Sequence, residues 1–245
     1  MHGLLPIMGN SSALAQGGSH MKRLTHKSVT DHLPAIVQAK HVARLALIAI
    51  GGIVYFVVAV SVLHFLRPEY NPINHAVSNY AVGPYGYLMT TAFFVLALSV
   101  FAMAFGLFRS IALTNPSRVA ILLLCLASIG AAVMGVFPGD AHALHPPATI
   151  TGIIHWTAAG ISFLSIMIAA FLLSDSFKTD KRWYVFRRPC LILALAMVGA
   201  LLLYGILALV GWIGIGQRIY LAVCLLWLLV LAGWIWSFGR MERSR

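Results

Sequence analysis

The sequence predicts an all-α integral membrane protein, built as a bundle of six transmembrane helices. Of its 245 residues, 60% are apolar and 9% are charged, whereas a soluble domain carries about 25% charged residues. Six stretches are each long enough to provide the roughly 20 apolar residues that a spanning helix needs. None alternates apolar and polar residues as a barrel strand does. Because backbone groups in lipid must pair within the chain, we expect all six to be helices.

The predicted spans follow one another with short polar connections. They cover residues 42–66, 85–108, 118–137, 147–173, 189–212 and 218–238. The third ends at Pro138 and Gly139, because proline does not continue the helical hydrogen bonds and glycine tolerates a turn. The fourth begins at Pro147, since proline is favoured at the first helical positions. The other four are defined by their apolar length alone.

The ends of the chain differ from its apolar middle. Residues 1–40 are rich in Gly, Ser, Asn and Gln and are predicted to form a disordered basic tail. Residues 41–240 form the predicted membrane domain, and residues 241–245 a short second tail. The first tail lacks a basic segment ahead of an apolar core, so we expect no signal peptide. "GSHM" resembles a vector scar and Met21 directly precedes a basic run, so the sequence allows a native start at Met21.

Basic residues predict the orientation of the bundle. Only Arg67 and Arg218 lie on one side, which leaves 15 of the 17 Lys and Arg on the other. The positive-inside rule then places both termini in the cytoplasm of a bacterial inner membrane. The net charge of +11 is explained by this topology and by attraction to anionic lipid head groups. Nucleic acid is not an expected partner, because no basic stripe with interleaved aromatics lies on a soluble face.

The connection between the first two predicted spans, "RPEYNPINHAVSNYAVGPYG", gathers polar residues on the outer side. Ser78 provides a hydroxyl group, and Arg67 and His75 provide groups that could bind a polar substrate. Arg218 opens the sixth span on the same side. For Ser78 the alternative is a capping or turn role, because the loop is rich in Gly and Pro.

The passage "FPGDAHALHPPATITGIIHW", residues 137–156, places Asp140 before the fourth span and His155 inside it. At 1.5 Å per residue, His155 lies roughly 12 Å below Pro147. Its neighbours three and four positions away are small: Thr151, Gly152, Ala158 and Ala159. Small residues let helices approach closely, so His155 is expected to point into the bundle. An inward ionisable residue is a candidate functional residue; the alternative is a neutral histidine bonded to a neighbouring carbonyl.

We expect these residues to form a pocket that opens outward between the first, third and fourth spans. His155 would lie at its base, with Asp140, Ser78 and Arg218 at its rim. Asp140 could orient the imidazole through Nδ1–H or share a metal ion with it. The two histidines of the connecting loop are expected to face water: His142 and His145.

These motifs resemble a bacterial integral-membrane family, the domain of unknown function nine-nine-eight. The resemblance covers roughly residues 45–240 and rests on the first outer loop, on "FPGD" and on "GIIHWTAAG". Members are similar in having a Ser-containing loop, an Asp after Phe-Pro and a His early in the fourth helix. By position this singles out Ser78, Asp140 and His155. Members often carry Thr where this chain has Gly139. The family implies a fold and no established activity.

The first functional hypothesis is an enzyme acting on lipid or lipid-linked head groups, whose bonds lie at this membrane depth. Ser78, Asp140 and His155 would be catalytic as a Ser–His–Asp set that activates the hydroxyl. Alternatively, Asp140 and His155 would hold a divalent metal such as zinc, whose bound water attacks an ester. Arginine suits phosphate recognition, and the candidate substrate-binding residues are Arg67, Arg218 and His75.

The second hypothesis is a non-enzymatic membrane sensor, accessory or assembly protein, in which the polar residues join the helix ends. The sequence leaves both hypotheses open, as it does the oligomeric state; membrane lipids are expected partners in either. Transport is less favoured, because no span has an Asp, Glu, Lys or Arg near mid-depth. A haem is disfavoured because His64 and His155 form the only histidine pair at suitable depth. The three cysteines have no paired spacing and indicate no thiolate metal site.

The charge distribution predicts that a reporter fused after Arg245 lies in the cytoplasm. Green fluorescent protein fused there should fluoresce and alkaline phosphatase should be inactive, because the phosphatase needs an oxidising compartment for its disulfides. The same reporters fused after Trp212, following five predicted spans, should give the opposite pattern. An active phosphatase after Arg245 would contradict the predicted orientation.

Overall fold

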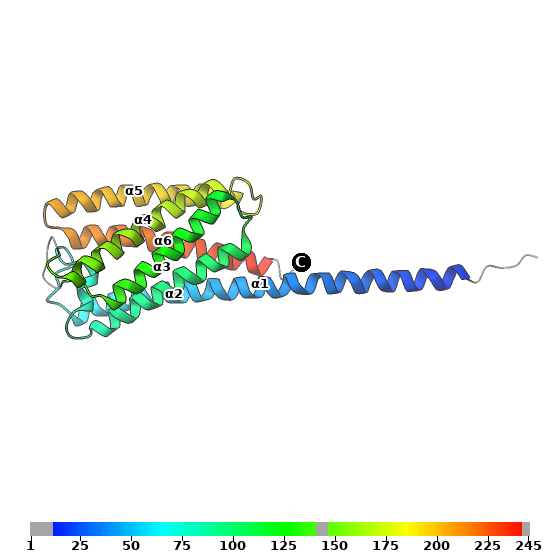
Figure 1. The fold of residues 1–245 in the computed structure, drawn as a ribbon, viewed down its shortest axis with the longest axis horizontal. Coiled ribbons are helices and arrows are strands. Elements are labelled where there is room, and N and C mark those ends of the chain that lie inside the picture. The colour runs from blue at the N-terminus through cyan, green and yellow to red at the C-terminus, as the bar shows by residue number, and fades with distance from the viewer. Residues whose placement is uncertain (1–11, 141–146, 242–245) are drawn as a thin grey trace, which may run out of the picture.

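The computed structural model describes residues 12–140 and 147–241, and their side chains from residue 38 to residue 240. Within these ranges the regular structure is helical, which confirms the all-α prediction (Figure 1). The long helices are α1 (Ser12–Leu66), α2 (Gly86–Ser110), α3 (Asn115–Val136), α4 (Ile150–Ser176), α5 (Arg187–Leu209) and α6 (Ile213–Met241). Two short 3₁₀ helices lie in the connections: η1 (Val77–Ala81) and η2 (Tyr184–Phe186).

Each of the six long helices contains a segment long and apolar enough to cross a membrane. In α1 this segment is Gln38–Leu66, and the earlier part of the helix extends away from the bundle (Figure 1). The six predicted spans are therefore confirmed as candidate membrane helices. The division into residues 1–40, 41–240 and 241–245 stays a prediction, and residues 1–11 and 242–245 lie outside the described residues.

The start of α4 differs from the predicted one. The helix begins at Ile150, three residues after Pro147, because Thr149 provides the N-cap: its hydroxyl accepts the N–H of Gly152 at 3.0 Å. A side-chain acceptor satisfies one of the N–H groups that a helix leaves unpaired at its start. His155 consequently lies five residues into the helix, about 7.5 Å along its axis rather than the expected 12 Å.

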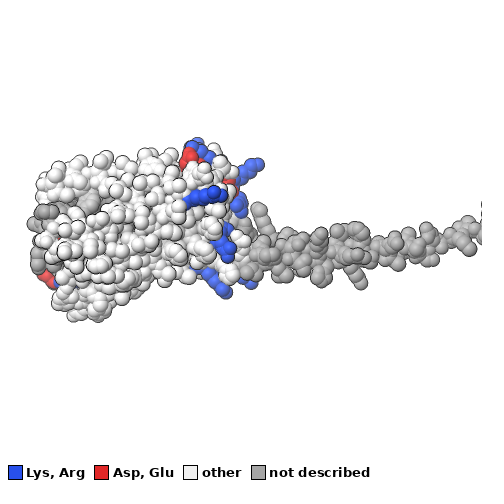
Figure 2. Space-filling view, in the orientation of Figure 1, with Lys and Arg blue, Asp and Glu red and all other residues white. Residues whose placement is uncertain are grey.

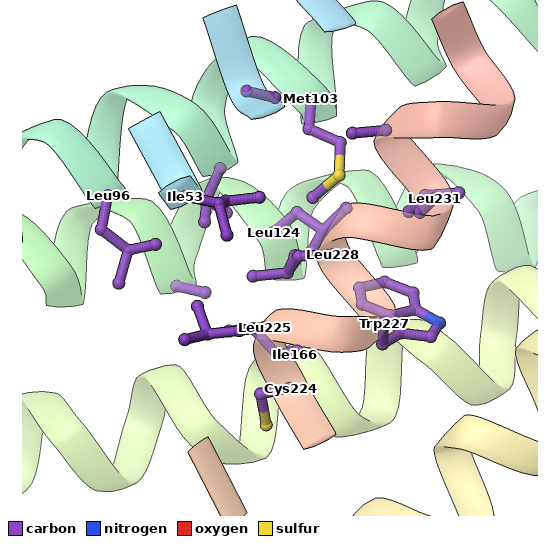
Figure 3. Close-up of a cluster of buried hydrophobic side chains, with 14 of the residues drawn as sticks. Ile53, Leu96, Met103, Leu124, Ile166, Cys224, Leu225, Trp227, Leu228 and Leu231 are labelled. Atoms are coloured by element: carbon purple, nitrogen blue, oxygen red, sulfur yellow. The ribbon is translucent and has the colours of Figure 1, made fainter. Parts of the chain in front are cut away.

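The helices form a ring in chain order, and α6 closes it by packing against both α5 and α1 (Figure 1). Side chains from five helices meet inside the ring, as Figure 3 shows for Ile53, Met103, Leu124, Ile166 and Leu228. Helix α5 is the least buried of the six: 22% of its most apolar segment is buried within the protein.

Small residues set the spacing of α3 and α4. A Cβ atom at Gly130 would lie 2.9 Å from the carbonyl oxygen of Ala158, which shows how closely the backbones approach. The Ser162 hydroxyl also donates across this interface to the carbonyl oxygen of Ala127 at 3.3 Å. The small face of α4 therefore packs inward, as the sequence around His155 predicts.

Charged residues gather at one end of the bundle, which we call the basic end (Figure 2). It contains the α2–α3 and α4–α5 connections and the end of α6. The opposite end, formed by residues 67–85, 137–140, 147–149 and 210–218, is called the site end; among the described basic residues it carries Arg67 and Arg218. The segregation of charge agrees with the sequence analysis, and the side of the membrane that each end faces stays a prediction.

Candidate functional site

Arg67 holds the loop between α1 and α2, although it is only 4% exposed. Its Nη1 donates to the carbonyl oxygens of Val82 and Pro84 at 2.7 and 2.6 Å. Its Nε donates to the carboxylate of Glu69, and this bond lowers the pKa of Glu69. The buried guanidinium thus satisfies carbonyl groups that would otherwise lose their hydrogen bonds to water.

The start of α6 holds the same loop from the other side. Two backbone N–H groups of its first turn donate to the carbonyl oxygen of Ile73 at 2.8 and 3.1 Å. Arg218 Nη1 donates to the carbonyl oxygens of Pro72 and His75 at 2.9 and 2.7 Å, and its Nη2 reaches the hydroxyl of Tyr80 at 3.3 Å. The loop is therefore fixed by the helix N-terminus together with a cation.

These contacts place η1, which carries Ser78. Gln217 Oε1 accepts the backbone N–H of Val77 at 2.7 Å, so the first residue of η1 is bound directly to α6. Tyr80, at the other end of η1, is fully buried. Ser78 lies between these two anchors and is half-buried.

The predicted substrate-binding residues all make contacts within the protein. Arg67 and Arg218 bind loop carbonyls, as described above. Nδ1–H of His75 donates to the carbonyl oxygen of Asn71 at 3.3 Å, and its ring packs against that of Tyr70 with centroids 5.3 Å apart. Their roles in substrate binding stay predictions.

Asp140 binds the start of α4. Its Oδ2 accepts the backbone N–H groups of Ala148 and Thr149 at 2.7 and 3.2 Å, and its Oδ1 accepts the Thr149 hydroxyl. The bond from this hydroxyl, with those from the two N–H groups, holds the pKa of Asp140 below its ordinary value. Gly152 allows this approach, since a Cβ there would lie 2.7 Å from the carboxyl carbon. Asp140 therefore organises the first turn of the helix that carries His155.

His155 is 2% exposed, which agrees with its predicted inward position. Its Nδ1 lies 2.8 Å from the carbonyl oxygen of Phe137 at the end of α3, and its ring packs edge-on against Phe93. Because a carbonyl only accepts, Nδ1 carries the hydrogen, and Nε2 is the remaining ring nitrogen. The partner of Nδ1–H is thus this carbonyl and not Asp140. Among the described residues, neither a hydrogen bond nor an ion pair joins Asp140 to His155.

Ser78 and His155 line one cavity of about 250 Å³. Other lining residues are Ala76, Trp156, Gly160, Leu201, Tyr204 and Gln217. The cavity lies between η1, α4, α5 and the start of α6, whereas the predicted pocket lay between the first, third and fourth spans. The reason is that small residues of α4, including Gly160, leave space in front of Tyr204 on α5.

A second cavity, of about 40 Å³, shares Ser78, His155 and Gln217 with the first. These three are the polar residues that the two cavities have in common. The second cavity is also lined by residues of α1, α2 and α3, so residues of the first, third and fourth spans do meet beside Ser78 and His155. Asp140 and Arg218, which were expected at the rim, are not among the residues that line either one.

Two polar residues of the cavity were missed in the sequence: Tyr204 and Gln217. Tyr204 has no local signal, because it is one aromatic residue within an apolar helix. Gln217 did have one, since it is an uncharged polar residue at the start of an apolar span, directly beside Arg218. An amide in such a position is expected to have a specific partner.

The predicted metal site is not tested by these contacts. In the part of the chain that the structure describes, no three His, Cys, Asp or Glu side chains are grouped to hold a metal ion. Both carboxylate oxygens of Asp140 already accept protein hydrogen bonds. His142 and His145 lie outside the described residues. A metal bound by Asp140 and His155 stays a prediction.

A family model described as "Protein of unknown function (DUF998)" matches residues 49–234. The chain belongs to the DUF998 family. The match runs from within α1 to within α6, so it includes parts of all six long helices and every residue that lines the cavity. This confirms the resemblance noted from the sequence motifs. No curated protein and no solved structure matches the chain, so the function of this DUF998 protein must be argued from its site.

Replacing Gly214 by Ala should destabilise the contact between α6 and the first loop. A Cβ there would collide with the carbonyl oxygens of Pro72 and His75, and such overpacking costs about 1–3 kcal/mol. Because 1 kcal/mol corresponds to about 2–4 °C in a chain of this size, thermal unfolding of the detergent-solubilised protein should begin several degrees lower. Gly233→Ala is the matched control, since a Cβ in that part of α6 meets nothing within 4 Å. Equal melting temperatures of the two variants would contradict the docking role of Gly214.

Replacing Asp140 by Asn should lower thermal stability at pH 7, because the amide provides a weaker acceptor for the α4 N-terminus. A carboxyl group with a lowered pKa stabilises the fold above its unfolded pKa of about 3.9 and loses this effect as pH falls through the lower folded value. The melting difference between wild type and Asp140→Asn should therefore be constant above about pH 5 and shrink below about pH 4.

The control is Asp175→Asn on α4, which removes the same charge from an exposed pair with Lys178, just after the helix. Exposed pairs contribute little, so this variant should melt close to wild type throughout. A larger loss for Asp175→Asn than for Asp140→Asn would contradict the capping role.

Proposed function

We propose that this DUF998 protein is a membrane-embedded hydrolase or transferase acting on lipid esters, with Ser78 as nucleophile and His155 as general base. The observation that carries the proposal is that both side chains line the same cavity at the site end. A hydroxyl and an imidazole within one mainly apolar cavity are the two groups that nucleophilic ester cleavage requires.

The hydrogen bond of His155 supports the role of a base. With Nδ1–H donated to the carbonyl oxygen of Phe137, the neutral ring keeps its lone pair on Nε2. A fixed acceptor at Nδ1 sets the tautomer and the ring orientation, as the acid does in a serine hydrolase triad. The backbone carbonyl takes that place here.

The proposed reaction has two steps, acylation of Ser78 and hydrolysis of the acyl-serine. Ser78 Oγ attacks the ester carbonyl carbon while its proton passes to His155 Nε2; the bond to the alcohol then breaks, and the alcohol leaves with that proton. Water next attacks the acyl-serine, giving a proton to His155, which returns it to Ser78 as the fatty acid leaves. A second alcohol in place of water gives acyl transfer.

Asp140 is proposed as a positioning residue. It binds Ala148 and the N-cap residue Thr149, directly before α4, and His155 follows within two turns of the same helix. Loss of the Asp140 carboxylate should therefore act on catalysis through the position of His155.

The second candidate function is a non-enzymatic accessory or sensor protein. It is favoured by a specific observation: the charged residues of the site end form hydrogen bonds with the protein's own loops and helix ends. They are Arg67, Arg218 and Asp140. Polar residues that only join helix ends need no substrate. Reactivity of Ser78 distinguishes the two functions.

A fluorophosphonate probe should label Ser78 in the purified full chain, because such probes react with activated serine hydroxyls. Ser78→Ala should abolish the labelling, and His155→Gln should slow it at least about a thousandfold, the loss typical of removing one member of a catalytic set. Mass spectrometry of the labelled peptide identifies the site.

Two controls separate reactivity from folding. Ser61→Ala removes an exposed hydroxyl that bonds only to its own helix at Val57, and His41→Gln changes an exposed histidine at the basic end; both should label as wild type does. Melting temperatures within a few degrees across all variants exclude unfolding as the cause. Absence of labelling in a well-folded wild type would reject the enzyme and favour the accessory function.

A further inference from the structure

We propose that the ligand of the Ser78–His155 cavity is an uncharged lipid ester with one acyl chain, which enters sideways from the bilayer between α4 and α5. The inference rests on the proposed function for the identity of the reacting bond, and it adds the class of lipid and its route. Three properties of the cavity support it: its apolar wall, its lack of charge and its size.

The apolar wall follows one face of α4 into the membrane. Trp156, Gly160 and Leu164 all line the cavity and recur every four residues, so they lie along one side of the helix over about 12 Å. Trp156 and Leu164 are 36% and 47% exposed within the span. A Cβ atom at Gly160 would meet nothing within 4 Å. The cavity is therefore open toward the lipid along the length that an acyl chain would occupy.

The polar part of the cavity is uncharged. None of its eleven described lining residues is Lys, Arg, Asp or Glu. The two arginines of the site end donate to backbone carbonyls instead, Arg67 to Val82 and Arg218 to His75. A phosphate inside the cavity would lose its hydration without gaining a cation, which is costly. An ester or hydroxyl head group suits the neutral donors and acceptors that are present.

Gln217 supplies the group that recognises such a head. Its Oε1 accepts the N–H of Val77, which leaves the amide nitrogen and its two hydrogens to donate to a ligand. An ester carbonyl oxygen next to Ser78 is an acceptor of the right kind. The amide therefore orients the ester for attack.

The volume limits the ligand to a single chain. Sites for drug-sized molecules span about 300–1,000 Å³, and this cavity measures about 250 Å³. The head group and the first part of one acyl chain fit that space, and the rest of the chain would extend into the bilayer through the opening; within the cavity there is no room for a second chain beside the first. Monoacylglycerols have this chemistry.

Brominated lipids test the inference, because bromine quenches tryptophan fluorescence on contact and Trp156 lines the cavity. The probes are a monoacylglycerol and a lysophosphatidic acid that carry the same dibrominated C18 chain, titrated into the full chain in nanodiscs. We expect saturable quenching by the neutral probe and at least about tenfold weaker binding of the anionic one. Trp156→Phe should remove the saturable component. Equal or tighter binding of the phosphate, or quenching that never saturates, would overturn the inference.

A matched pair of variants tests the route. Gly160→Leu fills the cavity from α4, while Gly199→Leu adds the same side chain on α5 at a position that also has open space and does not line the cavity. We expect Gly160→Leu to weaken binding of the neutral probe at least about tenfold, the effect of a small mismatch in an apolar pocket. Gly199→Leu should stay within about twofold of wild type. Equal affinities of the two variants would overturn the route.

Binding and reaction fail separately in these experiments. If the neutral probe binds and Gly160→Leu blocks it, while Ser78 never reacts with fluorophosphonate, the lipid class is supported and the enzyme is rejected. If Ser78 reacts as proposed but neither probe saturates, the enzyme is supported and the lipid class is overturned.

Discussion

The carbonyl groups of the first loop must find hydrogen-bond donors at the edge of an apolar bundle, and the geometry of the site end depends on how they do so. Two guanidinium groups and the first turn of α6 provide the donors: Arg67 from the end of α1, and Arg218 together with two backbone N–H groups from α6. A guanidinium carries five N–H groups, so one buried side chain can serve several carbonyls. The position of Ser78 follows from this arrangement, because η1 lies between the two fixed points.

The second connection of the site end uses the opposite charge for the same purpose. Asp140 accepts hydrogen bonds from the N–H groups of Ala148 and Thr149 directly before α4, where a negative charge also complements the helix dipole. The carbonyl oxygen of Phe137 at the end of α3 meets the His155 ring. The three charged residues therefore hold the loops and the start of α4 in place: Arg67, Arg218 and Asp140. The uncharged polar residues Ser78 and Gln217 line the cavity together with His155. A division of this kind is hard to see in a sequence, where all polar residues near a helix end look alike.

Hydrophobicity and charge made the fold predictable. Long apolar segments give the six helices, and the small residues around His155 indicate that it points inward. The predicted start of α4 was wrong because the cap of the helix depends on a contact between Asp140 and Thr149 across a loop. A proline near the start of an apolar span does not reveal such a contact. The contribution of α5 to the larger cavity was not predicted because the packing of α5 leaves no periodic pattern: Tyr204 and Leu201 resemble any other residues of an apolar span. The pairing of Gln217 with Val77 joins residues far apart in the chain and is visible only in three dimensions.

Because the cavity opens between α4 and α5, the ligand concentration that governs binding to this protein is the concentration in the bilayer and not that in water. A cavity that opens to water samples a ligand in three dimensions, whereas one lined along the span by Trp156 and Leu164 samples a two-dimensional fluid. Occupancy then follows the mole fraction of the ligand among its bilayer neighbours, and adding an inert lipid empties the site even when the total amount of ligand is unchanged. Detergent acts as such a diluent. The composition of the surrounding leaflet is thereby part of the binding equilibrium.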